Sequence, residues 1–320
     1  MKNEIIKLLP PCVRYIMNQI DIDYNSLIEL RFRICEPLIL VFKQGEYFVQ
    51  NCGGLTLDRK KAYRVTADDI RAILDAVTDY SLYAYEDEVR QGFVTVCGGH
   101  RVGVAGQVVL EHGRVKNVKH ISFINIRVSH QIQGCASGLL PYVIKDGRLL
   151  HTLIISPPGC GKTTILRDLV RLISDGNSYC RGMNVGVVDE RSEIAACYMG
   201  VPQNDVGLRT DILDGCPKAE GMLMLLRSMS PKVIAVDEIG SRDDIDAISY
   251  VINCGCGILA TIHGDSIDDI RTRPVLRKLV EEKVFERYIV LGNSAGIGTV
   301  ESIFDERGNE LYIGSLSVAN

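Results

Sequence analysis

The sequence predicts an α/β fold: a parallel sheet with helices on both faces, preceded by a smaller α+β N-terminal domain. After residue 148, short apolar runs alternate with helical patterns, which is typical of parallel sheets. Before residue 135, the sequence is rich in strand patterns and tight turns. The chain has 320 residues, of which 46% are hydrophobic, so it can form two domains with cores of their own.

The first domain is expected at residues 1–135. Helical apolar spacing in IIKLL and VRYIM is followed by period-two alternation in LIELRFRI, which indicates helix and then strand. A helix that opens with a capping-box pattern is predicted over 66–79. Two strands joined by a Gly-Gly turn are predicted over 93–110, and a further strand over 120–132.

Residues 136–148 are predicted to be a linker or hinge, and residues 149–320 the second domain. The stretch GCASGLLPYVIKDGR combines small residues, a proline and a turn signal between two different sequence textures. The second domain then alternates strands with helices. The strands are predicted at 150–156, 184–189, 232–237 and 257–263, and the helices at 163–175, near 218–228 and at 243–253.

A phosphate-binding loop is predicted at SPPGCGKTT, between a strand and a helix. Its glycines let backbone N–H groups face phosphate oxygens, Lys162 reaches the β and γ phosphates, and the Thr163 hydroxyl ligates Mg²⁺. Ser156 stands where the P-loop pattern has its first Gly, and its hydroxyl is expected to serve in its place. The predicted nucleotide-binding residues are Ser156, Pro157, Pro158, Gly159, Cys160, Gly161, Lys162, Thr163 and Thr164.

Two carboxylates follow the apolar strand KVIAV. Parallel α/β sheets bind ligands at the carboxyl ends of their strands, so Asp237 and Glu238 are expected at the nucleotide. Asp237 is predicted to hold Mg²⁺ through water, which makes Thr163 and Asp237 the predicted metal ligands. Glu238 is predicted to orient and deprotonate the attacking water.

Two more strands of this half end in polar residues. VVDERSE places Asp189 and Glu190 at a strand end, and GILATIH does the same for Thr261 and His263. Thr261 and His263 are two residues apart, so they face the same side of the sheet. His263 is predicted to be a sensor at the nucleotide. One acid of the Asp189–Glu190 pair is predicted to act in catalysis, and the sequence leaves open which.

Composition and the absence of certain patterns limit the classes of partner. A net charge of −4, no Trp and 6% aromatic residues disfavour a nucleic-acid channel, so no nucleic-acid partner is expected. There is no secretory leader pattern and no apolar run near the roughly 20 residues that cross a bilayer. We therefore expect a cytoplasmic protein that meets the membrane only through partners. The eleven cysteines lack zinc-site spacings and are expected to be free thiols.

ATP is the expected nucleotide, because the Asn-Lys-x-Asp element of GTPases is absent from the sequence. The second domain is therefore predicted to be a RecA-like P-loop ATPase core that hydrolyses ATP with Mg²⁺. Two alternatives remain open: a nucleic-acid-dependent motor, and a scaffold that uses ATP to assemble with little turnover. The presence of Lys162, Thr163, Asp237 and Glu238 argues against an inactive enzyme.

The order of these motifs resembles the secretion-type ATPases, which drive type II secretion, type IV pili and type IV secretion. SPPGCGKTT, VVDERSE, LLRSMSPKVIAVDEIGSRDD and ILATIHGDS stand in the places of that family's Walker A, Asp box, Walker B and His box. Over nearly the whole chain, the sequence resembles still more closely the stage III sporulation protein AA family of endospore-forming bacteria. It departs from most secretion ATPases at Asp237, where they carry Gly.

The resemblance implies further residues and partners. Arg101 and Arg127 in the first domain, and Arg227 before the Walker B strand, match arginines that stabilise charge on the transferring phosphoryl group. The resemblance also implies a homo-oligomer, a hexamer, whose partners are membrane proteins of a sporulation secretion-like complex. It places the ATPase on the mother-cell side of the forespore, where it energises assembly or operation of a secretion channel.

Overall fold

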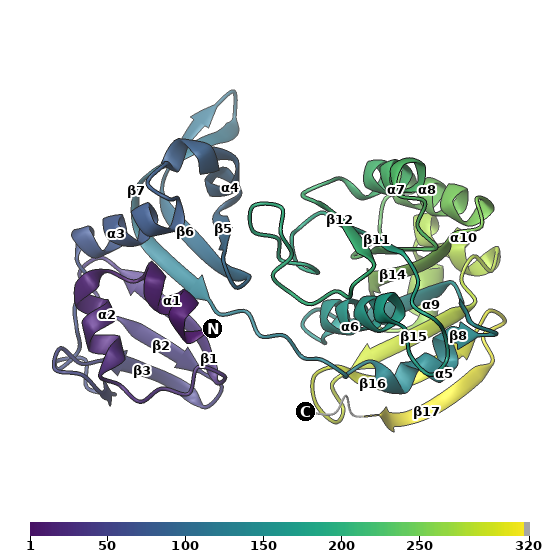
Figure 1. Cartoon of the computed structure of the whole chain (residues 1–320), viewed down its shortest axis with the longest axis horizontal. Helices are drawn as coiled ribbons and strands as arrows, with labels where there is room; N and C mark the ends of the chain where they lie inside the picture. Colours follow the sequence, from purple (N-terminus) through teal and green to yellow (C-terminus); the bar gives the residue numbers. More distant parts are fainter. Residues whose placement is uncertain (317–320) are drawn as a thin grey trace. The chain divides into compact units, whose positions relative to one another are not determined.

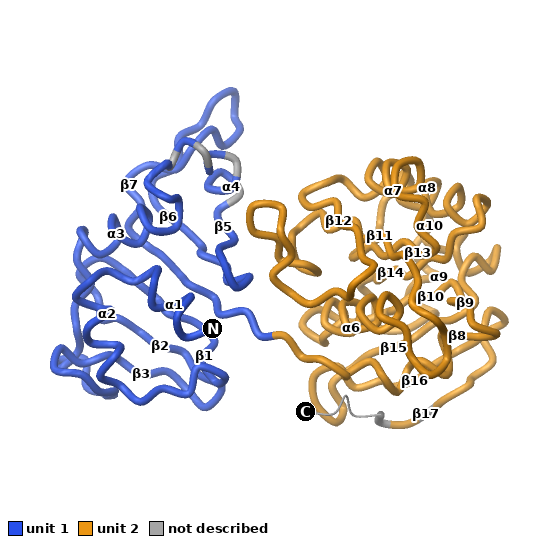
Figure 2. The backbone as a smooth tube through the Cα atoms, in the orientation of Figure 1, with its two compact units in different colours: residues 1–130 blue, residues 131–320 orange. Residues whose placement is uncertain are grey.

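The structure is a computed structural model that describes residues 1–316, apart from the side chains of Leu82, Ala84, Asp87, Gln91, Ile313, Ser315 and Leu316. The chain divides into two compact units, residues 1–130 and 131–320 (Figure 2). Residues 317–320, which end the predicted second domain, lie outside the described residues.

The first unit is a seven-stranded antiparallel sheet in the order β4-β3-β2-β1-β7-β6-β5, with helices packed on it (Figure 1). Ile5, Met17 and Ile73 of three helices share one core with Phe32 and Val102 of the sheet. The elements are α1 (Lys2–Leu8), α2 (Pro11–Asn18), β1 (Leu27–Arg33), β2 (Ile39–Phe42), β3 (Gly45–Val49), β4 (Leu55–Thr56), α3 (Ala67–Val77), η1 (Leu82–Tyr85), α4 (Glu86–Gln91), β5 (Phe93–Val96), β6 (His100–Glu111) and β7 (Arg114–Arg127).

Local sequence explains where the helices of this unit begin. Pro10 and Pro11 separate α1 from α2, because a proline fits the first helical turn but cannot continue a helix that precedes it. The predicted helix over 66–79 is confirmed as α3. Its capping box is present: the Thr66 side chain accepts the Asp69 N–H at 3.1 Å.

The long hairpin β6–β7 differs in its bounds from the prediction. The Gly-Gly turn between β5 and β6 is confirmed, but β7 begins at Arg114 rather than residue 120. His112 and Gly113 both have positive φ, 50° and 76°, which permits a two-residue turn directly between the paired residues Glu111 and Arg114. The strand ends at Arg127, so residues 128–132 are not part of it.

The second unit is an eight-stranded sheet in the order β12-β11-β13-β14-β10-β15-β16-β17 (Figure 1). The six strands from β12 to β15 are parallel, and β16 and β17 continue the sheet in antiparallel fashion. All strands and helices predicted for this half are present. The elements are η2 (Ser137–Leu139), α5 (Leu140–Val143), β8 (Ile144–Lys145), β9 (Arg148–Leu149), β10 (Thr152–Ser156), α6 (Lys162–Asp175), β11 (Val185–Asp189), β12 (Thr210–Asp214), α7 (Lys218–Ser228), β13 (Val233–Val236), α8 (Arg242–Asn253), β14 (Gly257–His263), α9 (Ile267–Thr272), α10 (Pro274–Glu281), β15 (Arg287–Gly292), β16 (Thr299–Asp305) and β17 (Glu310–Leu316).

Two apolar cores lie on opposite faces of this sheet. All five residues of β10 are buried; Ile154 joins the core with α5 and α6, whereas Leu153 and Ile155 join the core with α7 to α10. Successive side chains of a strand point to opposite faces, so a strand buried at every position is what a sheet covered on both sides requires. The cores fix the order of the strands, and thereby which strand ends meet at one edge.

The segment 136–148, which we predicted to be a linker, is packed into the second unit. It forms η2, α5 and the small β8–β9 pair, with Leu139, Leu140 and Val143 buried. Asp168 of α6 accepts the N–H of Ala136 at 2.8 Å and thus fixes the start of the segment. The apolar residues of the segment explain this packing, because their burial in the core that they share with α6 is favourable.

Candidate functional site

The P-loop joins β10 to α6. Gly159 and Gly161 have φ of 75° and 80°, in the left-handed region that glycine adopts without a steric cost. Gly161 is the N-cap of α6 and supplies no side-chain cap, so N–H groups of the first turn are available to an anion. The loop and the 14-residue helix behind it therefore form an anion-binding end.

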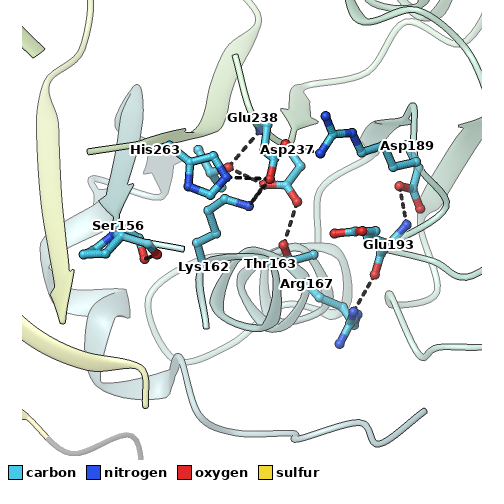
Figure 3. Close-up of polar contacts among 12 residues, drawn as sticks. Ser156, Lys162, Thr163, Arg167, Asp189, Glu193, Asp237, Glu238 and His263 are labelled. Carbon is cyan, nitrogen blue, oxygen red and sulfur yellow. Dashed lines mark hydrogen bonds and ion pairs between the residues drawn. The ribbon is translucent and has the colours of Figure 1, made fainter. Parts of the chain in front are cut away.

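Lys162 and Thr163, the first residues of α6, point to the two carboxylates that follow β13 (Figure 3). The buried Lys162 Nζ lies 2.7 Å from Glu238 Oε1 and 3.5 Å from Asp237 Oδ1. The Thr163 hydroxyl donates to Asp237 Oδ2 at 2.7 Å. β14 is the one strand between β10 and β13, and parallel pairing brings their carboxyl ends to the same edge.

Thr163 and Asp237 fit a magnesium site. Mg²⁺ prefers oxygen ligands and usually keeps several waters. The Thr163 hydroxyl and an Asp237 carboxylate oxygen lie 2.7 Å apart, so Thr163 could bind such a cation directly and Asp237 through water. No cluster of three or more His, Cys, Asp or Glu that could hold a metal occurs in the described part of the chain. A cation here would therefore draw its other ligands from phosphate and water.

Thr261 of β14 fixes both carboxylate residues. Its hydroxyl hydrogen-bonds Asp237 Oδ1 and accepts the backbone N–H of Glu238 at 3.0 Å. Its carbonyl accepts the Ile239 N–H at 2.9 Å. Glu238 has a φ of 56°, a left-handed backbone that costs a non-glycine residue about 1 kcal/mol. Thr261, fully buried, supplies the hydrogen bonds that hold this turn.

Glu238 is surrounded by three cationic or hydrogen-bonding side chains. Besides Lys162, it pairs with His263 Nε2 at 2.8 Å and Arg191 Nη1 at 2.6 Å. Partial burial acts to raise the pKa of Glu238, but the hydrogen bond and charge of Lys162, helped by His263 and Arg191, outweigh it and hold the pKa below its usual value. Glu238 is therefore ionised at neutral pH.

The position of His263 follows from the ionised Glu238. A carboxylate only accepts, so the Nε2 of His263 carries the proton and donates to Glu238. Nδ1 is buried and has no hydrogen-bond partner among the described residues. A cavity of 370 Å³ borders His263, Glu238 and Gly240, which leaves room at the side of this pair.

The acidic end of β11 is built differently from the site around Glu238. Asp189 is buried and accepts the backbone N–H groups of Glu193, Ile194 and Ala195 at 2.8–2.9 Å. Burial raises the pKa of Asp189, although these hydrogen bonds oppose the shift. Glu190 instead pairs with Lys218. Lys162 pairs with Asp237 and Glu238 rather than with these two carboxylates, whose catalytic role stays a prediction.

Arg167 supports the same loop from α6. Its guanidinium donates to the carbonyls of Ile194 at 2.6 Å and Glu193 at 2.5 Å (Figure 3). Asp189 takes the N–H groups of this loop and Arg167 takes its carbonyls, so together they set the course of the chain after β11. Arg191 lies in that course, two residues beyond the strand, and from there it reaches Glu238.

Ser156 does not present its hydroxyl to the loop interior as expected. It is fully buried at the end of β10, and its hydroxyl donates to the carbonyl of Pro157 at 2.9 Å. Phosphate binding by this loop would therefore depend on backbone N–H groups and on Lys162. Cys160 is buried as well, whereas Pro158 and Gly159 are exposed.

The three predicted arginines belong to β6, β7 and α7. Arg101 and Arg127 are directly paired across β6 and β7 in the first unit; Arg127 lies 3.6 Å from Glu29, and Arg101 stacks on Phe93 at 4.6 Å. Arg227 lies in the last turn of α7, which leads from the end of β12 back to the start of β13. It therefore lies at the sheet edge opposite the P-loop, and the structure does not bring it to Lys162 of its own chain.

Arg191, Arg167 and the double role of Thr261 were not assigned from sequence. β11 pairs with β13 so that Val188 lies beside Val236, which places Asp189 level with Asp237. Knowledge of that register would have placed Arg191 near Glu238. Arg167 follows Thr163 by four residues, and residues at that spacing lie on the same face of a helix. The sequence could therefore have placed Arg167 on the side of α6 that carries Thr163.

The comparisons with known proteins agree with this geometry. The family model described as "Sporulation stage III, protein AA" matches residues 1–311. Stage III sporulation protein AA of Bacillus subtilis (strain 168) is 43% identical over 310 residues, which are 97% of each chain. The resemblance to that family, stated from sequence, is confirmed.

Two solved structures share the fold. The ATPase DotB of Legionella pneumophila matches with a TM-score of 0.54 and 13% identity, over 83% of this chain and 72% of that chain. The pilus retraction motor PilT, solved with bound ADP, matches with a TM-score of 0.53 and 13% identity, over 90% of this chain and 77% of that chain. The predicted fold class, a RecA-like P-loop core after a smaller α+β domain, is confirmed.

Thr261→Val tests whether this threonine holds the turn at Glu238. Valine has nearly the same shape but leaves the Glu238 N–H and an Asp237 oxygen without their partner, so the free energy of unfolding should fall by about 2 kcal/mol. Thr261→Ser keeps the hydroxyl and should lose less. Urea unfolding followed by circular dichroism measures both. Equal stability of Thr261→Val and the wild type would show that the hydroxyl does not support the turn.

Proposed function

The chain belongs to the sporulation stage III protein AA family, and on that premise we propose that it is a Mg²⁺-dependent ATPase. Its hydrolysis of ATP drives the assembly or operation of a secretion-like membrane channel during sporulation. The observation that carries the proposal is the convergence of Lys162 and Thr163, at an uncapped helix start, on Asp237 and Glu238.

Lys162 is the group whose partners change in the proposed reaction. The ammonium that pairs with Glu238 is also the one that the β and γ phosphates of ATP recruit, beside the N–H groups of the P-loop. Once Lys162 turns to phosphate, Glu238 loses its strongest partner. Its pKa then rises and its carboxylate can accept a proton from water.

The other residues of the site keep Glu238 directed at that water. Thr261 holds the backbone, while the N–H of His263 and the guanidinium of Arg191 bind the carboxylate oxygens. Thr163 and Asp237 would hold Mg²⁺, whose charge would offset that of the phosphates. His263, next to Glu238, is suited to report whether the carboxylate is paired, in line with its predicted sensor role.

The roles of Arg101, Arg127 and Arg227 toward phosphate stay predictions. Arg101 and Arg127 face each other across β6 and β7, and Arg127 pairs with Glu29. Arg227 lies at the far edge of its own sheet, so a role in catalysis requires that it serve a neighbouring copy.

We further propose a ring of six chains that acts on membrane proteins of a sporulation complex from the cytoplasm, on the mother-cell side. No helix in the described residues is long and apolar enough to span a bilayer, so contact with the membrane would run through these partners. The secretion-type fold supports the ring, and membership of the sporulation family supports the setting.

Lys162→Ala tests the nucleotide site. Loss of the ammonium removes the cation that meets the β and γ phosphates, and steady-state ATP hydrolysis should fall by at least about 100-fold, with weaker ATP binding. Lys278→Ala, an exposed lysine of α10, is the control and should hydrolyse ATP at the wild-type rate. If Lys162→Ala binds and hydrolyses ATP like the wild type, the site is not where we place it.

The ring is tested by light scattering of the wild type with Mg²⁺ and a non-hydrolysable ATP analogue. A mass of six chains on addition of the analogue is expected, and Lys162→Ala should stay at the lower mass because it cannot recruit the phosphates. A mass of one chain under all conditions, with the analogue bound, would contradict the ring and leave the ATPase proposal intact.

A further inference from the structure

A large cavity lies at the edge of the second sheet opposite the P-loop. It has a volume of 1640 Å³ and is lined by the loop between α6 and β11 and by the residues that lead into β10, β13 and β14. Because these strands are parallel, their beginnings share one edge, as their ends do at the nucleotide site. None of its lining residues belongs to the site around Glu238.

The charges of this cavity are unbalanced. Its cationic side chains are Arg148, Arg181 and Lys232, against the single acid Asp175. Arg148 is neutralised by Glu286, to which it donates two hydrogen bonds of 2.9 and 2.7 Å. Within residues 1–316, neither Arg181 nor Lys232 has an ion pair, and both are exposed. With Glu286 and Asp175 counted against the three cations, the cavity keeps a net charge of +1, and among the described residues Arg181 and Lys232 are its cations without an ion pair.

His151 adds a hydrogen-bond donor to the same wall. Its Nδ1 accepts the N–H of Ile258 at 3.3 Å, so the neutral ring carries its proton on Nε2. Burial lowers the pKa of His151, which favours this neutral form. The ring thus offers one N–H rather than a third charge.

Apolar side chains lie beside these cations. Leu226 and Ile252 line the cavity, and Tyr179, which also lines it, is 47% exposed. An exposed aromatic side chain beside cations is typical of protein-binding surfaces.

We propose that this cavity docks an acidic segment of a partner protein. Carboxylates of the segment pair with Arg181 and Lys232, and its apolar side chains rest on Leu226, Ile252 and Tyr179. Nucleic acid fits less well, because tight binding to it uses a row of phosphate contacts and several stacking aromatics, whereas two unpaired cations and one aromatic side chain line this cavity. Docking here needs no contact with the nucleotide and does not depend on ATP hydrolysis.

The test is a selection of 12-residue peptides from a random display library on the full chain. Enrichment of peptides with several Asp or Glu among apolar residues is expected. The best synthetic peptide should bind Arg181→Glu/Lys232→Glu at least about tenfold more weakly by fluorescence anisotropy, and salt should weaken its binding to the wild type. Lys60→Glu/Lys61→Glu changes the net charge equally at exposed lysines of the first unit and should bind like the wild type.

Two further measurements keep the outcome decisive. Arg181→Gln/Lys232→Gln is the milder variant, and thermal unfolding like that of the wild type shows that weak binding is not a loss of fold. The docking site would be overturned if the selected peptides showed no acidic enrichment. It would also be overturned if the peptide bound both the Glu and the Gln double variant of Arg181 and Lys232 as tightly as the wild type. Binding of a labelled single-stranded oligonucleotide, without binding of any peptide, would also overturn it. So would a lower mass of the assembled protein in the Arg181→Glu/Lys232→Glu variant, since that marks a contact between copies.

Discussion

The candidate site depends on one ammonium group, Lys162 Nζ, which lies between the carboxylates of Asp237 and Glu238 at the edge where the parallel strands end. A buried lysine is costly unless it is paired, and here both partners lie within 3.5 Å. The pair ties the start of α6 to the end of β13, across the strand that lies between. The same charge lowers the pKa of Glu238, so in the reaction that we propose the placement of Lys162 governs when that carboxylate can act as a base.

Much of this site could be predicted from sequence because its chemistry uses neighbouring residues. The P-loop, Lys162 with Thr163, and Asp237 with Glu238 are each contiguous, and each follows an apolar run that ends at the sheet edge. The contacts of Arg191 and Thr261 come from other strands, and they depend on the register of β11 and β14 against β13. Register of parallel strands is set by packing on both faces, which a single sequence does not show.

The predictions that differ from the structure have physical causes. Residues 136–148 have the small residues of a linker, yet Leu139, Leu140 and Val143 bury against α6. The Ser156 hydroxyl is directed to a backbone carbonyl because it ends a fully buried strand, where a polar group needs a local partner. Asp189 ends β11 as predicted, and three N–H groups of the following loop bind its oxygens, so it also supports the loop that carries Arg191, while its catalytic role stays a prediction.

The most direct test of the account is a single-turnover experiment with Glu238→Gln and Mg-ATP. Glutamine keeps the size and one accepting oxygen but cannot take a proton, so we predict that the variant binds ATP and releases phosphate at least about 100-fold more slowly than the wild type, with its bound nucleotide still present as ATP. Glu282→Gln, an exposed carboxylate at the end of α10, serves as the control for the substitution itself. Phosphate release from Glu238→Gln at the wild-type rate would contradict the central role of the Lys162–Glu238 pair.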